Sequence, residues 1–150
     1  MASVAGALAE AVGQDLLAES EEVIVENGGD IFLRSAREVR VGIFAGESPL
    51  SLRVGLAVEA APHPWGVCTS SGSVGPSLSF GRADAVCILS PSASLADAAA
   101  TAVGNRVRTP ADLEKGLERA REIEGVSGAV IILGEKLAAW GKVKLTEIGD

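Results

Sequence analysis

Short runs of β-forming residues, each ended by turn residues, constrain the fold most strongly. In residues 39–43 and 52–58, apolar side chains alternate with polar or small ones, which is the pattern of half-buried antiparallel strands. The segment NGGD, residues 27–30, separates the β-rich runs Val23–Val25 and Ile31–Leu33, and such a segment is typical of a tight turn between strands. The sequence therefore predicts a mainly antiparallel sheet.

Three stretches carry helical patterns. Apolar residues recur at helical spacing over residues 2–17, and a second alanine-rich helix is expected to open at Ser94 and to stop at residues 104–105. Residues 109–112 contain the start signals of a third helix, which is expected to run to Gly125. These helices are rich in small residues, so they can pack closely on a sheet.

The remaining segments divide into strands and one long connection. The apolar runs at 83–90 and 128–134 predict interior strands, and residues 136–148 indicate further strands. Residues 61–77 are rich in Pro, Gly and Ser and are expected to form a long loop. We therefore predict one α+β domain over residues 1–150, with a mainly antiparallel sheet and alanine-rich helices packed on one face.

Composition excludes several classes of function. The chain has 18 Gly, 3 Phe, 2 Trp and no Tyr, which predicts a core of small aliphatic side chains and leaves few aromatic platforms for bases. Its net charge of −7 repels phosphate backbones, so we expect no nucleic-acid partner. No apolar run reaches the about 18 residues of a membrane span, and the N-terminal residues lack the basic region of a signal peptide.

The two cysteines and the single histidine carry weak signals. Cys68 and Cys87 have neither metal-ligand spacing nor the number needed for a disulfide framework, so a reducing, cytoplasmic compartment is expected. His63 stands between two prolines, five residues before Cys68, and nothing in the sequence orients it as a base or pairs it with a second metal ligand. We expect His63 to lie on the surface and Cys68 to be chemically unselective.

Asp97 and Thr101 form the most specific pair of polar residues. Their i,i+4 spacing places both side chains on one face of the second helix, where a carboxylate and a hydroxyl can share a hard cation such as Mg²⁺. The alternative is structural: Ser94 and Asp97 have the S-x-x-D spacing of a capping box, in which Asp97 caps its own helix. The pattern alone favours the cap.

Two loops could present the backbone to a ligand. Gly28 and Gly29 allow close approach and Asp30 could orient a polar group, although a simple two-residue turn explains the same residues. The run at 66–73 offers amides and hydroxyls to a phosphate, yet it lacks the ending of a Walker A loop and is equally explained as a surface loop.

Taken in order, three motifs resemble those of the ApbE-like superfamily, the family around the FAD:protein FMN transferases. VIVENGGDI resembles its N-x-G-G-D signature, GVCTSSG its T-S-G signature, and SASLADAAATAV its A-x-L-A-D-A-x-A-T-A signature. The segments SEEVIVENGGDIFL and LADAAATAVGN most resemble an uncharacterised branch of the superfamily. The resemblance covers nearly the whole chain.

The resemblance implies a site. In the transferases, the helix Asp and Thr bind Mg²⁺, FAD occupies the adjoining cleft, and FMN moves to a Thr or Ser of a target protein. Carried over by motif, the metal ligands are Asp97 and Thr101. The ligand-binding set carried over in the same way is Asn27, Gly28, Gly29, Asp30, Thr69, Ser70 and Gly72.

The chain also departs from the transferases. They follow T-S-G with a His-containing stretch, whereas residues 74–80 here contain no His, so no catalytic residue is assigned. Their chains are longer at the N-terminus, so the resemblance implies the C-terminal portion of a longer fold. The expected function is binding of a flavin nucleotide or another phosphorylated ligand with Mg²⁺. The alternative is a non-catalytic module that forms homo-oligomers, with Asp97 as a cap.

Overall fold

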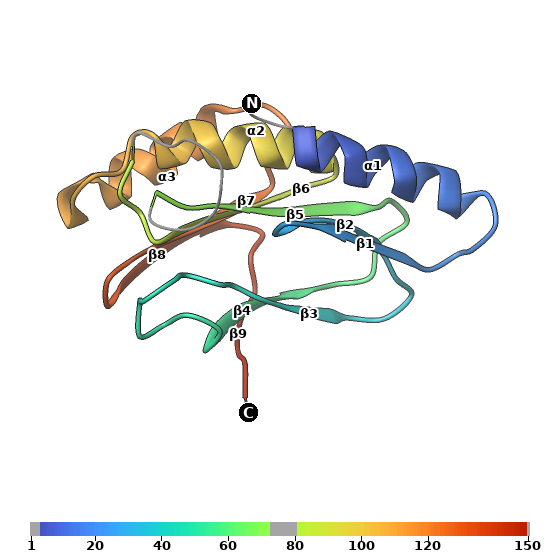
Figure 1. The fold of residues 1–150 in the computed structure, drawn as a ribbon, viewed down its shortest axis with the longest axis horizontal. Coiled ribbons are helices and arrows are strands. Elements are labelled where there is room, and N and C mark those ends of the chain that lie inside the picture. The colour runs from blue at the N-terminus through green and yellow to red at the C-terminus, as the bar shows by residue number, and fades with distance from the viewer. Residues whose placement is uncertain (1–3, 73–80, 150) are drawn as a thin grey trace.

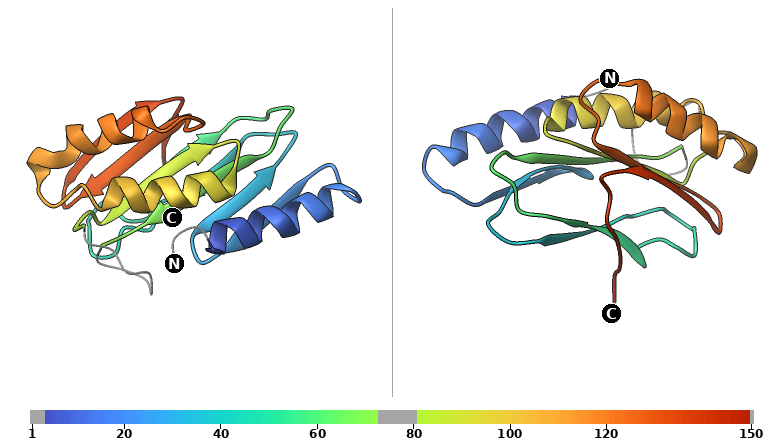
Figure 2. Two further views of the ribbon diagram at one scale, coloured as in Figure 1. Left: turned by 90° about the horizontal axis from the view of Figure 1, so that it is seen from above. Right: turned by 180° about the vertical axis from the view of Figure 1, so that it is seen from behind.

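The computed structural model describes residues 4–72 and 81–149, which form three layers. A layer of helices covers one face of a central six-stranded sheet, and a smaller three-stranded sheet lies against its other face (Figure 1). The views from above and from behind show all three long helices on the same side of the central sheet (Figure 2). The predicted α+β class, with helices packed on one face, is confirmed.

The six-stranded sheet is antiparallel throughout. Its order is β1 (Val23–Asn27), β2 (Asp30–Arg34), β5 (Trp65–Ser70), β6 (Ala85–Ser90), β7 (Gly128–Leu133) and β8 (Lys136–Gly141). The predicted turn between β1 and β2 is confirmed: Gly28 and Gly29 both have positive φ, 61° and 94°, as a two-residue hairpin turn requires.

The second sheet consists of β3 (Val39–Gly42), β4 (Val54–Val58) and β9 (Leu145–Glu147), in that order. The two alternating runs of the sequence thus pair with each other as expected. They do not extend the central sheet, however, because their apolar sides pack against its lower face around Leu33, Leu56 and Val67. Alternation reports which face of a strand is buried, not which sheet the strand joins.

The helical layer contains α1 (Val4–Leu17), α2 (Ala93–Gly104) and α3 (Leu113–Glu122), the last preceded by a 3₁₀ turn (Pro110–Asp112). The expected start signal of α3 is confirmed, since Thr109 and Asp112 form a capping box. A second apolar cluster lies between these helices and the central sheet, around Phe32, Ile88 and Val103. The central sheet is therefore buried on both faces.

The loop expected over residues 61–77 is wrong at its centre. Trp65–Ser70 is strand β5, which pairs with both β2 and β6. Small residues are needed there because α2 lies directly on the strand: a Cβ at Gly66 would overlap the backbone of Ala93. The composition of residues 65–70 reflects this close helix-to-strand contact and not a flexible connection.

No helix in residues 4–72 and 81–149 has the length and apolar character needed to cross a membrane.

Candidate functional site

Asp30 and Asp97 meet between the central sheet and the helices. Asp30 is the first residue of β2 and its Cα partner on β5 is Cys68, while Asp97 lies in the second turn of α2. Their exposed fractions are 7% and 9%, so two acidic side chains are removed from water side by side. Acidic side chains are rarely buried unless they are paired. Here the two side chains are both acidic, and the charge of Asp97 disfavours a charge on Asp30.

Asp97 does not cap its own helix, so the capping box predicted for Ser94 and Asp97 is wrong. The N-cap of α2 is Ser92, whose hydroxyl accepts a hydrogen bond from the Leu95 amide at 3.1 Å. The helix begins one residue before Ser94, which places Asp97 beyond the reach of the N-terminal amides of α2. Instead, Asp97 Oδ2 accepts a hydrogen bond from the Gly6 amide at 2.9 Å.

A reciprocal bond joins the two helices. Glu10 Oε1 of α1 accepts a hydrogen bond from the Ala93 amide at the start of α2, at 3.0 Å. The pairs Gly6–Asp97 and Glu10–Ala93 show that the first turns of α1 and α2 overlap in antiparallel orientation, as the centre of the helical layer in Figure 1 also shows. Each carboxylate thus satisfies an amide that its partner helix cannot satisfy internally.

The first turns of α1 and α2 also affect the electrostatics of the site. The N-terminus of an α-helix carries a partial positive charge, and here two such termini meet above the sheet. A helix N-terminus favours anions nearby, including phosphate groups. The overlap therefore provides a setting in which closely spaced negative charges are tolerated.

Asp30 has an unusual electrostatic environment. Burial, and secondarily the nearby Asp97 carboxylate, raise the pKa of Asp30 to about 7. Its Oδ1 is buried and has no hydrogen-bond partner. A buried oxygen without a partner is rare and costs stability. Near neutral pH, a large fraction of the Asp30 carboxyl groups are therefore protonated.

The donor set fits a hard cation that keeps part of its water shell. In the described residues, no three His, Cys, Asp or Glu side chains gather as a metal site, so a closed zinc-type site is not formed there. Asp30 and Asp97 supply two carboxylates, and Thr101 lies one turn beyond Asp97 on α2. Mg²⁺ uses one or two carboxylates together with water and phosphate oxygens. The residues present therefore fit Mg²⁺.

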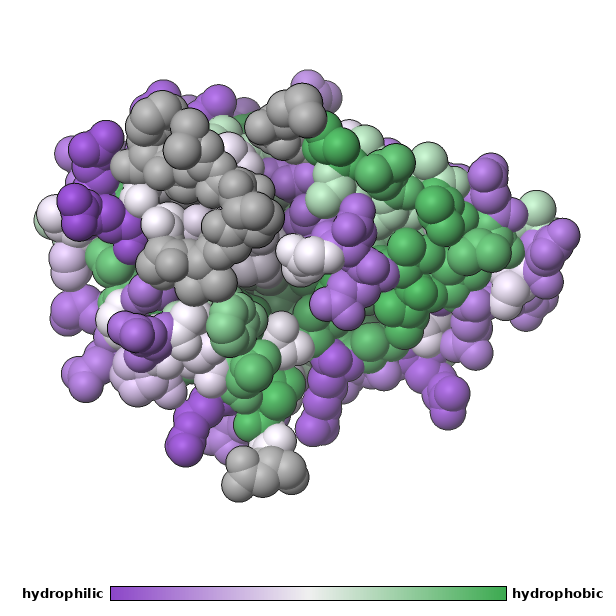
Figure 3. Space-filling model, viewed as in Figure 1, coloured by the Kyte–Doolittle hydropathy of each residue, from purple (hydrophilic) through white to green (hydrophobic). Residues whose placement is uncertain are grey.

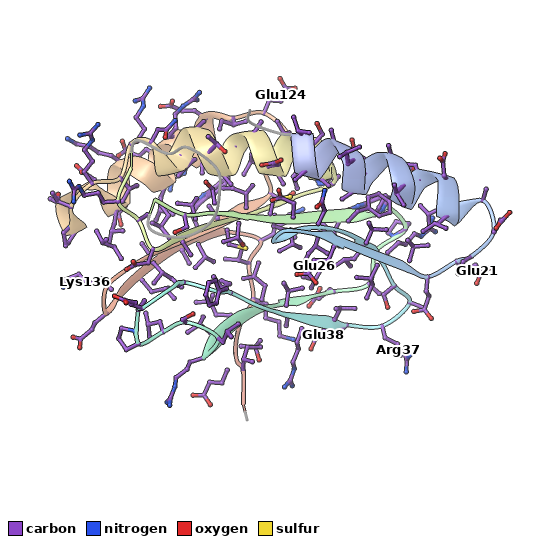
Figure 4. All side chains as sticks on the ribbon, in the orientation of Figure 1. Glu21, Glu26, Arg37, Glu38, Glu124 and Lys136 are labelled. Carbon is purple, nitrogen blue, oxygen red and sulfur yellow. The ribbon has the colours of Figure 1, made fainter. Side chains whose placement is uncertain are left out.

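A second feature lies on the opposite face of the hairpin. A cleft of about 230 Å³ opens between the central sheet and the β3–β4 layer, and Gly28, Gly29 and Thr69 line it. Its apolar walls include Phe44 and Leu52, and Glu26 of β1 lies between the two sheets (Figure 4). The Thr69 amide donates to the Gly29 carbonyl at 3.2 Å, which fixes the turn against the end of β5.

The predicted ligand-binding residues thus fall on two faces of the sheet. Gly28, Gly29 and Thr69 line the cleft, whereas Asp30 faces Asp97 on the helical side. The Asn27 side chain contacts α1, with Nδ2 donating to the Ala5 carbonyl at 3.4 Å.

The other two members of the predicted set do not line the cleft. Ser70 ends β5 beside these residues, and the Gly72 amide donates to the Ala83 carbonyl at 3.0 Å. Of the run at 66–73, Ser73 lies outside the described residues. Residues 74–80, where the sequence departs from the transferases, lie outside them as well.

Sequence reasoning missed several neighbours of the site. Gly6 and Glu10 contact α2, and Phe44 and Leu52 wall the cleft. Leu52 adopts φ 57°, an uncommon conformation for a branched side chain. No local sequence pattern identifies these residues, because each lies beside a segment that is distant in the sequence.

Cys68 is fully buried, and burial, followed by the nearby Asp30 charge, raises the pKa of its thiol strongly. Its Sγ donates to the Ala93 carbonyl at 3.3 Å. His63 contacts Trp65 and the Pro64 carbonyl instead. This arrangement agrees with the expectation that no Cys–His pair forms, and it makes Cys68 a poor nucleophile.

Comparisons with known proteins agree with this architecture. The family model described as "AbpE bacteria" matches residues 1–145. A UPF0280 protein of Methanosarcina acetivorans is 48% identical over 145 residues, and one of Methanococcus aeolicus is 44% identical over 148 residues. Each alignment covers 95% of this chain but only 57% and 60% of the relative, so the chain spans less than two thirds of their length.

The fold is also similar to a solved structure. The apo form of the Pseudomonas stutzeri flavinyl transferase ApbE superposes with a TM-score of 0.63 at 22% identity. The match covers 92% of this chain and 49% of that chain. At this identity the likeness concerns the fold.

Proposed function

Because this chain belongs to the family described as AbpE bacteria, we propose that it binds a phosphorylated ligand, a flavin nucleotide first of all, through Mg²⁺ held by Asp30 and Asp97. The observation that supports this most is the buried, unpartnered Oδ1 of Asp30 beside a second carboxylate. A divalent cation would neutralise both charges and give that oxygen a partner.

The roles of the residues follow from their contacts. The Gly6 amide donates to Oδ2 of Asp97, which orients this carboxylate beside Asp30. Asp30 would supply the other protein oxygen, and Thr101 a hydroxyl from the next turn of α2. When bound, Mg²⁺ supplies positive charge to which phosphate oxygens can coordinate.

The N-termini of α1 and α2 support the same ligand chemistry. Two helix N-termini converge beside Asp97, and such termini favour phosphate groups. The cleft lined by Phe44, Leu52 and Thr69 lies across the sheet at the same hairpin and is suited to an apolar ring. We assign the phosphate end of the ligand to the helical side of the sheet, beside the two aspartates.

Flavin is the first candidate because the similar solved structure is a flavinyl transferase. We propose binding only. The stretch in which the transferases carry a His has none here, so no transfer step is assigned to this chain.

Isothermal titration calorimetry tests the proposal. FAD, FMN and ADP are titrated into the protein in Mg²⁺ and in EDTA. We expect at least one nucleotide to bind about tenfold or more tightly with Mg²⁺, and Asp97→Asn to remove that gain. Glu118→Gln, which changes an exposed acid on α3, is the matched control and should bind as the wild type does.

Two results would count against the proposal. Nucleotide affinity that is the same in Mg²⁺ and EDTA would remove the metal from the account. Affinity that survives Asp97→Asn, in a variant whose circular dichroism is unchanged, would move the site elsewhere.

A further inference from the structure

Glu10 lies beside the candidate site without belonging to its donor set. Its carboxylate reaches from α1 to the first turn of α2, where Oε1 accepts a hydrogen bond from the Ala93 amide at 3.0 Å. Within residues 4–72 and 81–149, no third acidic side chain joins Asp30 and Asp97 in a metal-binding cluster. An effect of Glu10 on the site must therefore pass through another group.

The bond made by Glu10 is coupled to the bond that orients Asp97. Gly6 and Glu10 are one turn apart on α1, and their partners Asp97 and Ala93 are one turn apart on α2. Gly6 approaches α2 so closely that an added Cβ would overlap the Asp97 Cβ and the Ala93 carbonyl oxygen. The two bonds together therefore define how closely α1 packs on α2.

Apolar packing fixes the position of α1 less firmly than that of α2. The residues that α1 buries are among the smallest: Gly6, Ala9 and Gly13. In the space-filling view, green residues gather on the outside of α1 (Figure 3). The large apolar residues of α1, which are 44–55% exposed, are Val4, Leu8, Val12 and Leu16. Small side chains bury little apolar area, so hydrogen bonds contribute a larger share of what holds α1 in place.

A further polar contact of α1 is weaker than the bond made by Glu10. The Asn27 side chain of β1 donates to the Ala5 carbonyl at 3.4 Å, and this bond is exposed to solvent. The bond from Ala93 to Glu10 is shorter and partly buried, and its acceptor is a carboxylate. Hydrogen bonds to ionised groups are stronger than those between neutral groups. Glu10 is therefore the main polar anchor of α1 beside the site.

We infer that Glu10 is a positioning residue, which holds α1 on α2 through the Ala93 amide and thereby keeps the Gly6 amide on the Asp97 carboxylate that binds Mg²⁺. This inference rests on the proposed Mg²⁺ site. Groups that hydrogen-bond to a metal ligand orient it, and their loss typically weakens metal binding about 10- to 100-fold. The role belongs to the hydrogen bond of Glu10 and not to its charge.

Three substitutions of Glu10 separate the bond from the charge. Glu10→Ala removes both, and Glu10→Gln keeps an oxygen that can accept the same bond. Glu10→Asp keeps the charge but is shorter by one methylene and does not reach Ala93. Gln14→Ala, which changes an exposed residue one turn further along α1, is the matched control.

Two measurements are made on each folded variant. Calorimetry gives the affinity for Mg²⁺ alone, without nucleotide. Amide hydrogen exchange, followed by NMR in metal-free buffer, gives the opening of the bond from Gly6 to Asp97. Exchange at Ile88, which is fully buried in β6, reports opening of the whole domain and serves as the reference.

We expect Glu10→Ala and Glu10→Asp to weaken Mg²⁺ binding about tenfold. Exchange at Gly6 should become about tenfold faster in both variants, in excess of any change at Ile88. Glu10→Gln should stay within about threefold of the wild type in both measurements, because its amide oxygen accepts the bond from Ala93. Gln14→Ala should change neither quantity.

Three results would overturn the inference. Unchanged Mg²⁺ affinity in folded Glu10→Ala would make Glu10 only a cap of α2, whatever happens to stability. Equal losses of affinity in Glu10→Gln and Glu10→Ala would assign the effect to charge. Equal acceleration of exchange at Gly6 and Ile88 would indicate general destabilisation. A wild type that binds no Mg²⁺ is a different failure, because it would remove the proposed site itself and with it the role of Glu10.

Discussion

Helices α1 and α2 are both rich in alanine and overlap at their first turns, yet they use their surfaces differently. α2 buries Ala93, Ala96, Ala99, Ala100 and Val103 against the sheet and α3. α1 buries only Gly6, Ala9 and Gly13 and exposes four larger residues. The packing of α2 is thus completed within the described chain, whereas the large apolar residues of α1 stay exposed there.

The difference explains where the candidate site can be built. A site needs side chains held in place by packing, and α2 lies on the sheet between α1 and α3. Asp97 and Thr101 belong to that helix, and α1 contributes a backbone amide through Gly6. α1 therefore closes the site from one side.

Glycine substitutions should produce the largest difference between the two helices. Gly66→Ala places a Cβ against the backbone of Ala93, which cannot rotate away, and we expect a loss of about 3 kcal/mol or more. At Gly13→Ala, the three atoms nearest to the new Cβ belong to the side-chain ring of Phe32 and not to backbone, and the change gains about 1 kcal/mol of helix propensity, so its net loss should be smaller. Urea denaturation at constant m-value measures both. Equal losses would contradict the closer packing of α2.

The buried pair should produce a pH effect of similar size. The pKa of Asp30, about 7, lies above the ordinary 3.8, so the folded protein holds this proton more tightly than the unfolded chain does. The contribution of Asp30 to stability is therefore most favourable below about pH 4 and is lost as the pH rises to 7. Without metal, we expect a loss on the order of 2–3 kcal/mol between pH 5 and pH 8.

Asp30→Asn isolates this effect, because it removes the titrating group and leaves the others in place. The difference in unfolding free energy between wild type and Asp30→Asn should change with pH in metal-free buffer. A difference that stays constant from pH 5 to pH 8 would show that Asp30 does not titrate in this range.

Substitution of Ser92, the N-cap of α2, should change the free energy of unfolding by a smaller amount. Ser92→Ala removes the hydroxyl that accepts from the Leu95 amide and should cost about 1 kcal/mol. Ser94→Ala removes no cap and, as the matched control two residues away, should change stability by less than about 0.5 kcal/mol. Thermal unfolding of both variants gives the comparison, and a larger loss at Ser94 would restore the capping role that the pattern assigned to Ser94 and Asp97.

Much of the fold follows from local patterns. The β1–β2 hairpin was predictable because Gly-Gly between β-rich runs has few conformations to choose from, and β6 and β7 because their apolar runs suit interior strands. β5 was missed because its small residues give it the composition of a loop. These residues are small because α2 packs closely on Gly66, a contact that is distant in the sequence.

The candidate site was harder to predict than the fold. Asp30 and Asp97 are separated by 67 positions, and no spacing rule brings them together; the family motifs singled out both residues without pairing them. The local reading of Asp97 as a cap failed because the helix begins at Ala93 and because its amide partner, Gly6, lies on another helix. Tertiary partners decide the role of a buried carboxylate.

The central claim is that Asp30 and Asp97 hold a cation in place of a proton. Calorimetric titration of Mg²⁺ in two buffers of different ionisation enthalpy measures the protons released on binding, because the released protons are taken up by the buffer. With a pKa of about 7 for Asp30, we predict release of about 0.8 proton per Mg²⁺ at pH 6.5 and about 0.1 at pH 8. Mg²⁺ binding without proton release at pH 6.5, or release that persists in Asp30→Asn, would contradict the account.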